Sequence, residues 1–336
     1  MKRHGELYSK IVDINNLRLA DLKARQKKHN TYGVIKHDKN REGNMLLLQR
    51  DLIEKRFKTS KYKVFTVLTP KERVIYQLPY YPDRIVHHAL MNVLEPLWKS
   101  LFIEDTYACI KGRGIHRAMC RVKESLKDVE GTKYCLKFDI KKFYPSIDHD
   151  VLKSIVRKKI KCRDTLSLLD GIIDSAPGVP IGNYLSQYFA NLYLSYFDHY
   201  AKEVLRLRYY FRYADDIVVL HQSKEFLHDL LKEIKRYLIE NLKLELKSNY
   251  QVFPVEKRGI DFVGFVFYHS HTRMRKGIKK NFCRRMKKVE NFDLPGYKIE
   301  VCSWLGWAKY SNSRHLLKTN LKYYDQIILR RRAKTA

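Results

Sequence analysis

The chain has 336 residues and carries 67 Lys and Arg against 36 Asp and Glu, which gives a formal net charge of +31. Such an excess of positive charge is typical of proteins that bind polyanions, although a basic chain can also bind an acidic partner or a membrane surface. The sequence has no stretch of about 18 apolar residues to cross a bilayer and no secretory-type apolar run after its N-terminus, so we expect a cytoplasmic protein.

The first half of the chain predicts helices and one hairpin. Residues 6–60 are polar and helical in character. The segments Lys63 to Leu68 and Arg73 to Leu78 alternate around four turn residues, 69–72, which predicts a β-hairpin. Periodicity predicts further helices over residues 83–100, 115–128, 149–160, 183–200 and 226–242. A short strand, Leu242 to Leu246, is expected to follow and to end at Lys247.

Three acidic residues lie at the ends of predicted strands. Apolar and other residues alternate from Tyr134 to Ile140, and Asp139 lies near the end of that run. The tetrad Tyr213-Ala214-Asp215-Asp216 stands between two apolar, aromatic and β-branched segments, which predicts a hairpin with both acids at its tip. A lone Asp is commonly a turn former or a cap, and an exposed Asp-Asp turn would look the same. Three carboxylates on neighbouring strands can instead hold two Mg²⁺ ions for in-line phosphoryl transfer.

The C-terminal part is strongly basic. Nine Lys or Arg and no acid occur from Arg273 to Lys288. Phe282, Met286 and Val289 recur at helical spacing, which predicts a helix with one apolar side. Its basic side can follow the phosphates of a nucleic acid, or it is simply a solvated face.

In the order of its motifs the chain resembles the reverse transcriptases. The matching segments are Tyr80–Leu90 and Lys111–Ala118 for the fingers, Phe138–Tyr144 and Tyr213–Asp216 for the catalytic palm, and Gly259–Phe265 for the primer grip. The resemblance implies an α+β right-hand polymerase with an antiparallel palm sheet and a helical thumb. It also implies a division into residues 1–130 (N-terminal region and fingers), 131–265 (palm with inserted fingers helices) and 266–336 (thumb).

The segment between the acids is similar to one subfamily, the reverse transcriptases of diversity-generating retroelements. Ile181 stands before Gly182 where most reverse transcriptases have Gln, and Ser186-Gln187 replaces Ser-Pro. Residues 271–276 and 303–308 also resemble this subfamily. Leu185, where the subfamily has Thr, and Ala214, where it often has Met, depart from its pattern.

The resemblance implies an RNA-directed DNA polymerase, a nucleotidyltransferase encoded by a bacterium, an archaeon or a phage. It would copy a template-repeat RNA into cDNA, with errors at template adenines, for mutagenic retrohoming. Its expected partners are template RNA, the primer and cDNA, dNTP substrates and a small basic accessory variability protein that forms an oligomer, with no membrane. The expected cofactor is a pair of Mg²⁺ ions, with Mn²⁺ as the alternative ion.

The resemblance also assigns roles to single residues. Asp139, Asp215, Asp216 and the carbonyl of Ile140 would bind metal, and Lys247 would give a proton to the leaving pyrophosphate unless it is an ordinary exposed lysine. Tyr144 would exclude a 2′-hydroxyl, although either it or Phe143 is a core aromatic. The other nucleotide-binding candidates are Lys63, Lys71, Arg73, Ile181, Gly182 and Gln187. Nucleic-acid contacts are expected from Arg273, Arg275, Lys276, Lys279, Lys280, Arg284 and Arg285, and the primer grip from Phe262 and Gly264.

Two kinds of alternative stay open. The chain could be another prokaryotic reverse transcriptase, of the group II intron, retron or phage-defence type. Ile181 and Ser186-Gln187 argue against the intron type, and the roughly seventy residues after the primer grip are expected to hold a thumb and no appended nuclease. The chain could also be a catalytically silent RNA-binding scaffold. The three intact aspartates argue against that reading.

Overall fold

The computed structural model describes residues 3–68, 72–287 and 304–320. They belong to two compact units that alternate along the chain. The first unit comprises Met1–Lys111, Asp139–Leu207 and Lys232–Ser248, and the second comprises Gly112–Phe138, Arg208–Leu231 and Asn249–Ala336. Helices and antiparallel strands are mixed in the chain, as the predicted α+β class requires. The division into fingers, palm and thumb stays a prediction.

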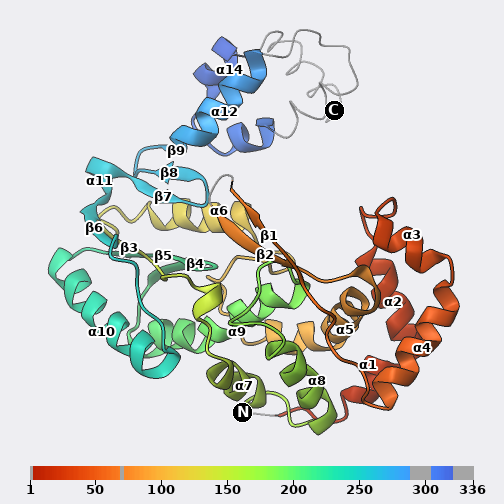
Figure 1. The fold of residues 1–336 in the computed structure, drawn as a ribbon. Helices are drawn as coiled ribbons and strands as arrows, with labels where there is room; N and C mark the ends of the chain where they lie inside the picture. The colour runs from red at the N-terminus through yellow and green to blue at the C-terminus, as the bar shows by residue number, and fades with distance from the viewer. Residues whose placement is uncertain (1–2, 69–71, 288–303, 321–336) are drawn as a thin grey trace, which may run out of the picture. The chain divides into compact units, whose positions relative to one another are not determined.

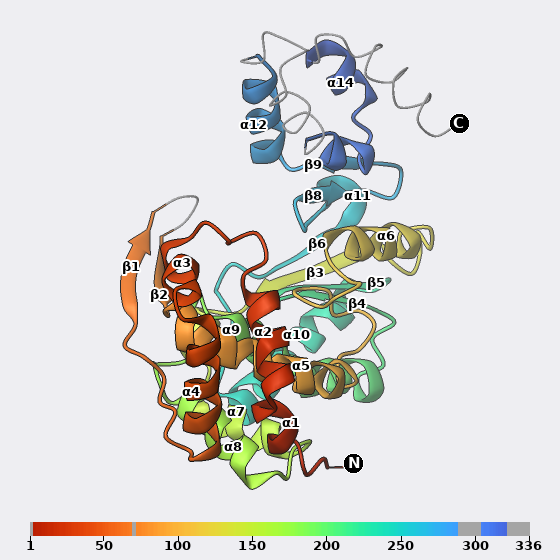
Figure 2. The same cartoon turned by 90° about the vertical axis from the view of Figure 1, so that its right-hand side faces the viewer.

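The first unit is mainly helical. Its N-terminal helices α2, α4 and α5 lie side by side in both views (Figures 1 and 2), and α2 packs against α4 and α5. The helices and helical turns of this unit are α1 (Tyr8–Val12), α2 (Ile14–Ala24), α3 (Tyr32–Asp38), α4 (Arg41–Ile53), η1 (Tyr80–Arg84), α5 (Ile85–Lys99), η2 (Tyr144–Ser146), α7 (His149–Arg157), α8 (Arg163–Ile173), α9 (Tyr184–His199) and η3 (Tyr200–Val204).

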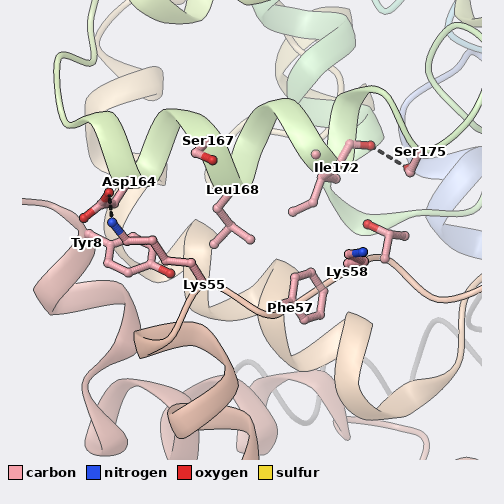
Figure 3. Close-up of a pocket in the computed structure, with 11 residues that line it drawn as sticks. Tyr8, Lys55, Phe57, Lys58, Asp164, Ser167, Leu168, Ile172 and Ser175 are labelled. Atoms are coloured by element: carbon pink, nitrogen blue, oxygen red, sulfur yellow. Dashed lines mark hydrogen bonds and ion pairs between the residues drawn. The ribbon is translucent and has the colours of Figure 1, made fainter.

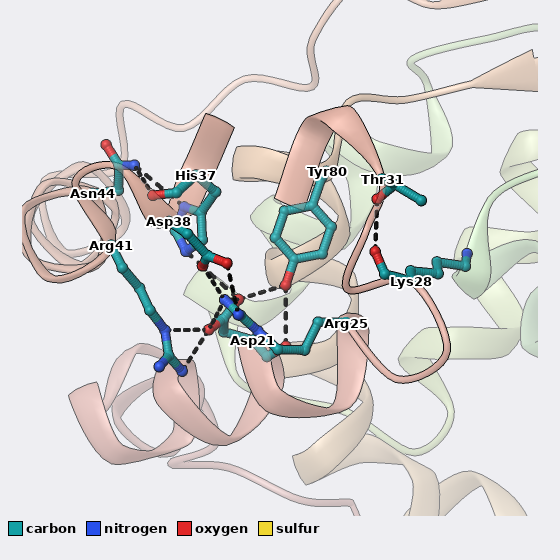
Figure 4. A network of polar contacts seen from close by, with 9 residues as sticks. All are labelled: Asp21, Arg25, Lys28, Thr31, His37, Asp38, Arg41, Asn44 and Tyr80. Carbon is teal, nitrogen blue, oxygen red and sulfur yellow. Dashed lines mark hydrogen bonds and ion pairs between the residues drawn. The ribbon is translucent and has the colours of Figure 1, made fainter. Parts of the chain in front are cut away.

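A buried carboxylate joins the N-terminal helices (Figure 4). Asp21 on α2 is fully buried and accepts hydrogen bonds from Arg25 Nη2 at 2.8 Å, Arg41 Nε at 2.7 Å and the Tyr80 hydroxyl at 2.5 Å. Burial acts to raise the pKa of Asp21, but the hydrogen bonds of Tyr80 and Arg25 and the neighbouring positive charges outweigh it and hold this pKa below its usual value. The network therefore ties α2 to α4 and to η1, the turn from which α5 begins.

The hairpin predicted between Lys63 and Leu78, hereafter the fingers hairpin after its expected domain, is present. Strands β1 (Lys63–Val67) and β2 (Arg73–Gln77) pair in antiparallel fashion, and most of their side chains are exposed. The hairpin is fixed to the rest of the unit by its backbone, because Tyr76 N–H donates a hydrogen bond of 2.8 Å to the Ile181 carbonyl. Lys71, at the predicted tip, lies outside the described residues.

The second unit is built on two sheets. The four-stranded sheet has the order β4 (Tyr209–Tyr213), β5 (Asp216–His221), β3 (Tyr134–Asp139) and β6 (Gln251–Pro254). Helix α6 (Ile115–Ser125) packs against β4. The three-stranded sheet has the order β7 (Ile260–Phe262), β8 (Phe265–Phe267) and β9 (Thr272–Met274), and its four Phe and Met side chains are buried. Helices α11 (Val255–Arg258), α12 (Lys276–Lys287) and α14 (Arg314–Asn320) also belong to this unit.

One predicted strand is wrong. Helix α10 (Lys224–Leu242) includes the first residue of the predicted strand from Leu242 to Leu246. Lys243 then adopts a positive φ of +50°, which ends the helix, and only Leu246 forms an isolated antiparallel bridge, to Ile140.

None of the helices in the described ranges has both the length and the apolar character that a membrane span requires.

Candidate functional site

The β4–β5 hairpin presents two adjacent acids at its tip, as predicted. Tyr213 ends β4, Ala214 and Asp215 form the turn, and Asp216 begins β5. Ala214 has a φ of +54°, in the left-handed region that residues with a side chain seldom adopt. The buried Arg212 holds this turn, because its Nη1 donates a hydrogen bond of 3.1 Å to the Ala214 carbonyl. The conformation thus places both aspartates where the two strands meet.

The third acid ends a strand in the same sheet. Asp139 is the last residue of β3, and β3 lies beside β5 in the strand order. Lys247 binds Asp139 twice: its Nζ contacts Oδ2, and its backbone N–H donates a hydrogen bond of 2.9 Å to the Asp139 carbonyl. The backbone bond from Lys247 is one of two in the antiparallel bridge between Ile140 and Leu246. The other runs from Lys141 N–H to the Glu245 carbonyl. Neither bond of this bridge uses the Ile140 carbonyl.

The structure adds a lysine that the sequence analysis did not single out. Lys137 Nζ lies 3.2 Å from Asp216 Oδ1 and donates a hydrogen bond of 3.3 Å to Oδ2. Its position two residues before Asp139 puts both side chains on one face of β3. This period of two is a signal in the sequence, but the contact with Asp216 depends on β5 being the neighbour of β3.

The donor chemistry fits hard divalent cations. Carboxylate and carbonyl oxygens are the ligands that Mg²⁺ and Mn²⁺ prefer. In this structure the ammonium groups of Lys247 and Lys137 provide the positive charge beside Asp139 and Asp216. In the part of the chain that the structure describes, however, no three His, Cys, Asp or Glu side chains are gathered closely enough to hold one metal ion. Assembly of the three aspartates around metal is therefore a proposal.

The two aromatic residues after the first acid have different environments. Phe143 is 3% exposed and belongs to the core, whereas Tyr144 is half-buried. Their rings meet edge to face, with centroids 5.5 Å apart. The Tyr144 carbonyl accepts a hydrogen bond of 2.9 Å from Val179 N–H, at the start of the segment that leads to Gly182. Of the two aromatics, Tyr144 is the more exposed.

Gly182 lies where the fingers hairpin meets this segment. Its φ is +124°, and a Cβ at this position would lie 2.6 Å from the Tyr76 carbonyl oxygen. A side chain would therefore push β2 away. Gln187 is exposed on α9, and Ile181 is half-buried.

The two described cations of the hairpin lie apart. Lys63 and Arg73 are exposed, but the register pairs Lys63 with Gln77 and Arg73 with Val67. Four residues of extended strand, roughly 14 Å, separate the two positions. The structure therefore does not bring Lys63 and Arg73 together around one phosphate.

The predicted primer grip is a tight turn in the second unit. Phe262 is fully buried in β7, so its ring packs in the core and leaves only backbone for contact with nucleic acid. Gly264 has a φ of +90°, and a Cβ there would lie 2.6 Å from the Trp307 ring and 2.9 Å from Ile278 of α12. The turn is thus packed against the helical part that follows it.

Helix α12 has the predicted apolar side. Phe282 and Met286 are buried, whereas five basic residues of the helix are exposed: Lys276, Lys279, Lys280, Arg284 and Arg285. Val289 lies outside the described residues. Arg273 is exposed on β9, but Arg275 is engaged by Asp261, with Nε donating a hydrogen bond of 2.6 Å to Oδ1.

A separate cavity of about 300 Å³ lies in the first unit, between the segment after α4 and helix α8 (Figure 3). Phe57, Leu168 and Ile172 supply apolar wall, and Lys55 pairs with Asp164 at 2.6 Å on its rim. No residue that the sequence analysis assigned to catalysis or nucleotide binding lines this cavity.

Comparisons with known proteins define the class. Residues 56–267 match the family described as reverse transcriptase (RNA-dependent DNA polymerase), and the chain belongs to this family. It is 26% identical over 241 residues to protein YkfC of Escherichia coli K12, a match that covers 58% of this chain and 63% of that protein. It is 26% identical over 192 residues to the group II intron-encoded protein LtrA of Lactococcus lactis subsp. cremoris, covering 54% of this chain and 31% of that protein.

The chain thus spans less than two thirds of the length of these relatives. Among solved structures, the chain is similar to apo telomerase from Candida tropicalis, with a TM-score of 0.50 and 13% identity over 73% of this chain and 57% of that one. At this identity the likeness concerns the fold alone. Together with the family it confirms the predicted right-hand polymerase class.

Proposed function

We propose that this chain is an RNA-directed DNA polymerase that extends a primer by nucleotidyl transfer. The observation that carries this proposal is the acidic β4–β5 turn, set in a sheet whose β3 ends in Asp139, inside the segment that matches the family. Asp139, Asp215, Asp216 and the Ile140 carbonyl would hold two divalent ions. Bound Mg²⁺ would supply the positive charge that activates the primer 3′-hydroxyl and stabilises the leaving pyrophosphate.

The chain's own groups have separate tasks in this reaction. The primer oxygen forms a bond to the α-phosphorus of the dNTP while the bond to pyrophosphate breaks. Lys247, which binds Asp139 in this structure, is the proposed proton donor to the pyrophosphate. The half-buried Tyr144 is the proposed barrier to a 2′-hydroxyl, because an aromatic ring beside the sugar leaves no room for that atom.

Nucleic acid would bind through the exposed cations of α12. Five Lys and Arg side chains of that helix are exposed, whereas Phe282 and Met286 are buried. Such a group of cations neutralises phosphates without reading sequence. The proposed ligands are the RNA template and the growing cDNA.

The reaction is tested by extension of a DNA primer on an RNA template with dNTPs and Mg²⁺. Asp139→Asn and Asp215→Asn should each abolish extension, because a neutral amide cannot replace a carboxylate ligand, while binding of the RNA–primer duplex persists. Asp164→Asn is the matched control, since this acid pairs with Lys55 and lines the separate cavity, which contains none of the three aspartates. Near-wild-type extension by either active-site variant would contradict the assignment.

For the biological role we propose mutagenic retrohoming in a diversity-generating retroelement, with a small basic accessory protein as partner. Ile181-Gly182 and Ser186-Gln187 support this subfamily, whereas the similarity to LtrA favours a group II intron-type enzyme as the second candidate. The Ile181 carbonyl accepts a hydrogen bond from Tyr76 N–H, which fixes the backbone at position 181 beside the hairpin.

The two roles are separated by sequencing cDNA made on one adenine-containing RNA template. Gln at position 181 would add a hydrogen-bonding group, worth about 0.5–1.5 kcal/mol or roughly twofold to twelvefold in discrimination. Ile181→Gln should therefore lower misincorporation opposite adenine. Equal adenine error rates in the two active enzymes would contradict the proposed role of Ile181, whereas a wild-type enzyme whose errors are not concentrated at adenine would favour the intron-type candidate.

A further inference from the structure

Lys137 connects an acid of the proposed metal site to the second sheet. Its ammonium contacts Asp216 at 3.2 Å and also donates a hydrogen bond to the backbone carbonyl of Asp261 in β7. The Lys137 side chain is 22% exposed and that of Asp216 is 29% exposed. One residue of β3 thus joins the strand that begins with Asp216 to the strand that precedes the Gly264 turn.

The connection continues into the basic helical region. The Asp261 carboxylate binds Arg275 through Nε at 2.6 Å, and Arg275 N–H donates a hydrogen bond of 3.0 Å to the Gly264 carbonyl. Arg275 immediately precedes α12. Asp216, Lys137, Asp261 and Arg275 therefore form a continuous chain of polar contacts inside the second unit.

We infer that Lys137 is a positioning residue: it sets the Asp216 carboxylate and couples it to the β7–β8 turn. This inference rests on the proposed function. A partly buried charge loses hydration, and its partners must offset that cost. If Lys137 served only to join the two sheets, an apolar side chain in its place could do so without this cost. The Lys137 ammonium instead contacts Asp216, the acid that begins β5. Its other contact is the backbone carbonyl of Asp261, which is present whatever side chain stands at position 261.

The coupling has a chemical consequence for the metal site. The ammonium neutralises part of the charge of Asp216, so it competes with metal for that carboxylate while restricting its orientation. Removal of the ammonium should therefore have two opposite effects. Metal should bind at lower concentration, and the chemical step should become slower because the carboxylate is no longer fixed.

The test compares kcat and KM for primer–template with the half-saturating Mg²⁺ concentration for binding, which isothermal titration calorimetry of the full chain measures without turnover. Lys137→Met, which keeps the length and removes the charge, should lower kcat by about tenfold or more, the usual scale of a charge-assisted hydrogen bond. Its half-saturating Mg²⁺ concentration should fall. Lys137→Arg keeps the charge and should retain more activity than Lys137→Met. Lys133→Met, an exposed lysine just before the same strand, is the matched control and should behave as wild type.

Asp261→Asn separates the two halves of the connection. It keeps the carbonyl that Lys137 uses and removes the charge that Arg275 binds, so it should raise KM for primer–template several-fold with kcat unchanged. An unchanged half-saturating Mg²⁺ concentration in folded Lys137→Met would overturn the inference, as would a loss of activity that only follows a loss of folded protein. An inactive wild type would overturn the proposed function itself, which the wild-type assay shows before any variant is compared.

Discussion

At the scale of single residues, Phe143 and Tyr144 are adjacent aromatics with different exposure. Phe143 packs in the core, and Tyr144 is half-buried next to the segment that leads to Gly182. Tyr144→Ala should therefore relax discrimination against ribonucleotides, because the bulk of the ring is the excluding element. Single-nucleotide incorporation of dNTP and rNTP measures this preference.

The neighbouring ring is the control for that experiment. Phe143→Ala should lower the free energy of unfolding by about 3–5 kcal/mol, the range for a buried Phe, without a selective gain in rNTP use. An unchanged sugar preference in Tyr144→Ala would move the barrier to another residue.

Gly182 allows the fingers hairpin to approach closely. Gly182→Ala places a Cβ 2.6 Å from the Tyr76 carbonyl and imposes a φ of +124° on a residue with a side chain. Strain of this kind is on the order of 1–3 kcal/mol. We expect a lower melting temperature and a higher KM for dNTP. Gly171→Ala is the matched control, because a Cβ there meets nothing within 4 Å, and in helix α8 it should stabilise by roughly 0.5–1 kcal/mol. Equal behaviour of the two variants would refute the role of the close approach.

At the scale of elements, the β7–β8 turn and α12 act as one packed piece. Gly264→Ala would place a Cβ 2.6 Å from Trp307 and 2.9 Å from Ile278, in a backbone conformation with a φ of +90°. The ring and the helix must then move, so we predict shorter products per binding event and reduced thermal stability. Gly277→Ala, in α12 with nothing within 4 Å, should leave product length unchanged. Wild-type product lengths from Gly264→Ala would show that this packing does not position the primer.

The sequence predicted the elements better than their contacts. The acidic hairpin and the amphipathic α12 follow from local alternation and helical spacing, which neighbouring residues determine. The separation of Lys63 from Arg73 could also have been derived, since it follows from hairpin register. The pairing of Lys137 with Asp216, and of Arg275 with Asp261, depends on which strands become neighbours.

Two other differences have local causes. The predicted strand from Leu242 failed because α10 extends to Leu242 and the positive φ of Lys243 then ends the helix, so only Leu246 forms a bridge, to Ile140. Alternation along β7 turns the Phe262 ring into the core, so its place in the primer grip stays a prediction that would use its backbone. A short apolar run in a sequence does not tell which of its side chains pack in the core and which contact a ligand.

At the scale of the whole molecule, buried histidines make stability depend on pH. Burial lowers the pKa of His87 to about 3 and that of His88 to about 4, from an ordinary value of 6.5. Between about pH 6.5 and pH 3 to 4, His87 and His88 bind protons in the unfolded chain but not in the folded chain. The free energy of unfolding should therefore fall as the pH decreases through this window, by up to about 1.4 kcal/mol per pH unit for each histidine.

His87→Leu isolates this contribution. The His87 Nε2 has no hydrogen-bond partner among the described residues, so an apolar replacement removes the titrating group without breaking a bond at that atom. Urea unfolding at several pH values should show a shallower loss of stability toward pH 4 in His87→Leu than in wild type. Parallel curves would mean that His87 is not responsible.

The central claim is that this chain copies RNA into DNA, and the most direct measurement is primer extension by the purified wild-type protein. The assay supplies a DNA primer on an RNA template with Mg²⁺ and either dNTPs or rNTPs. We predict full extension with dNTPs, little with rNTPs and none by Asp215→Asn. Absence of RNA-templated extension by folded wild-type protein that still binds the duplex, with either set of nucleotides, would contradict the claim and leave an RNA-binding scaffold as the better description.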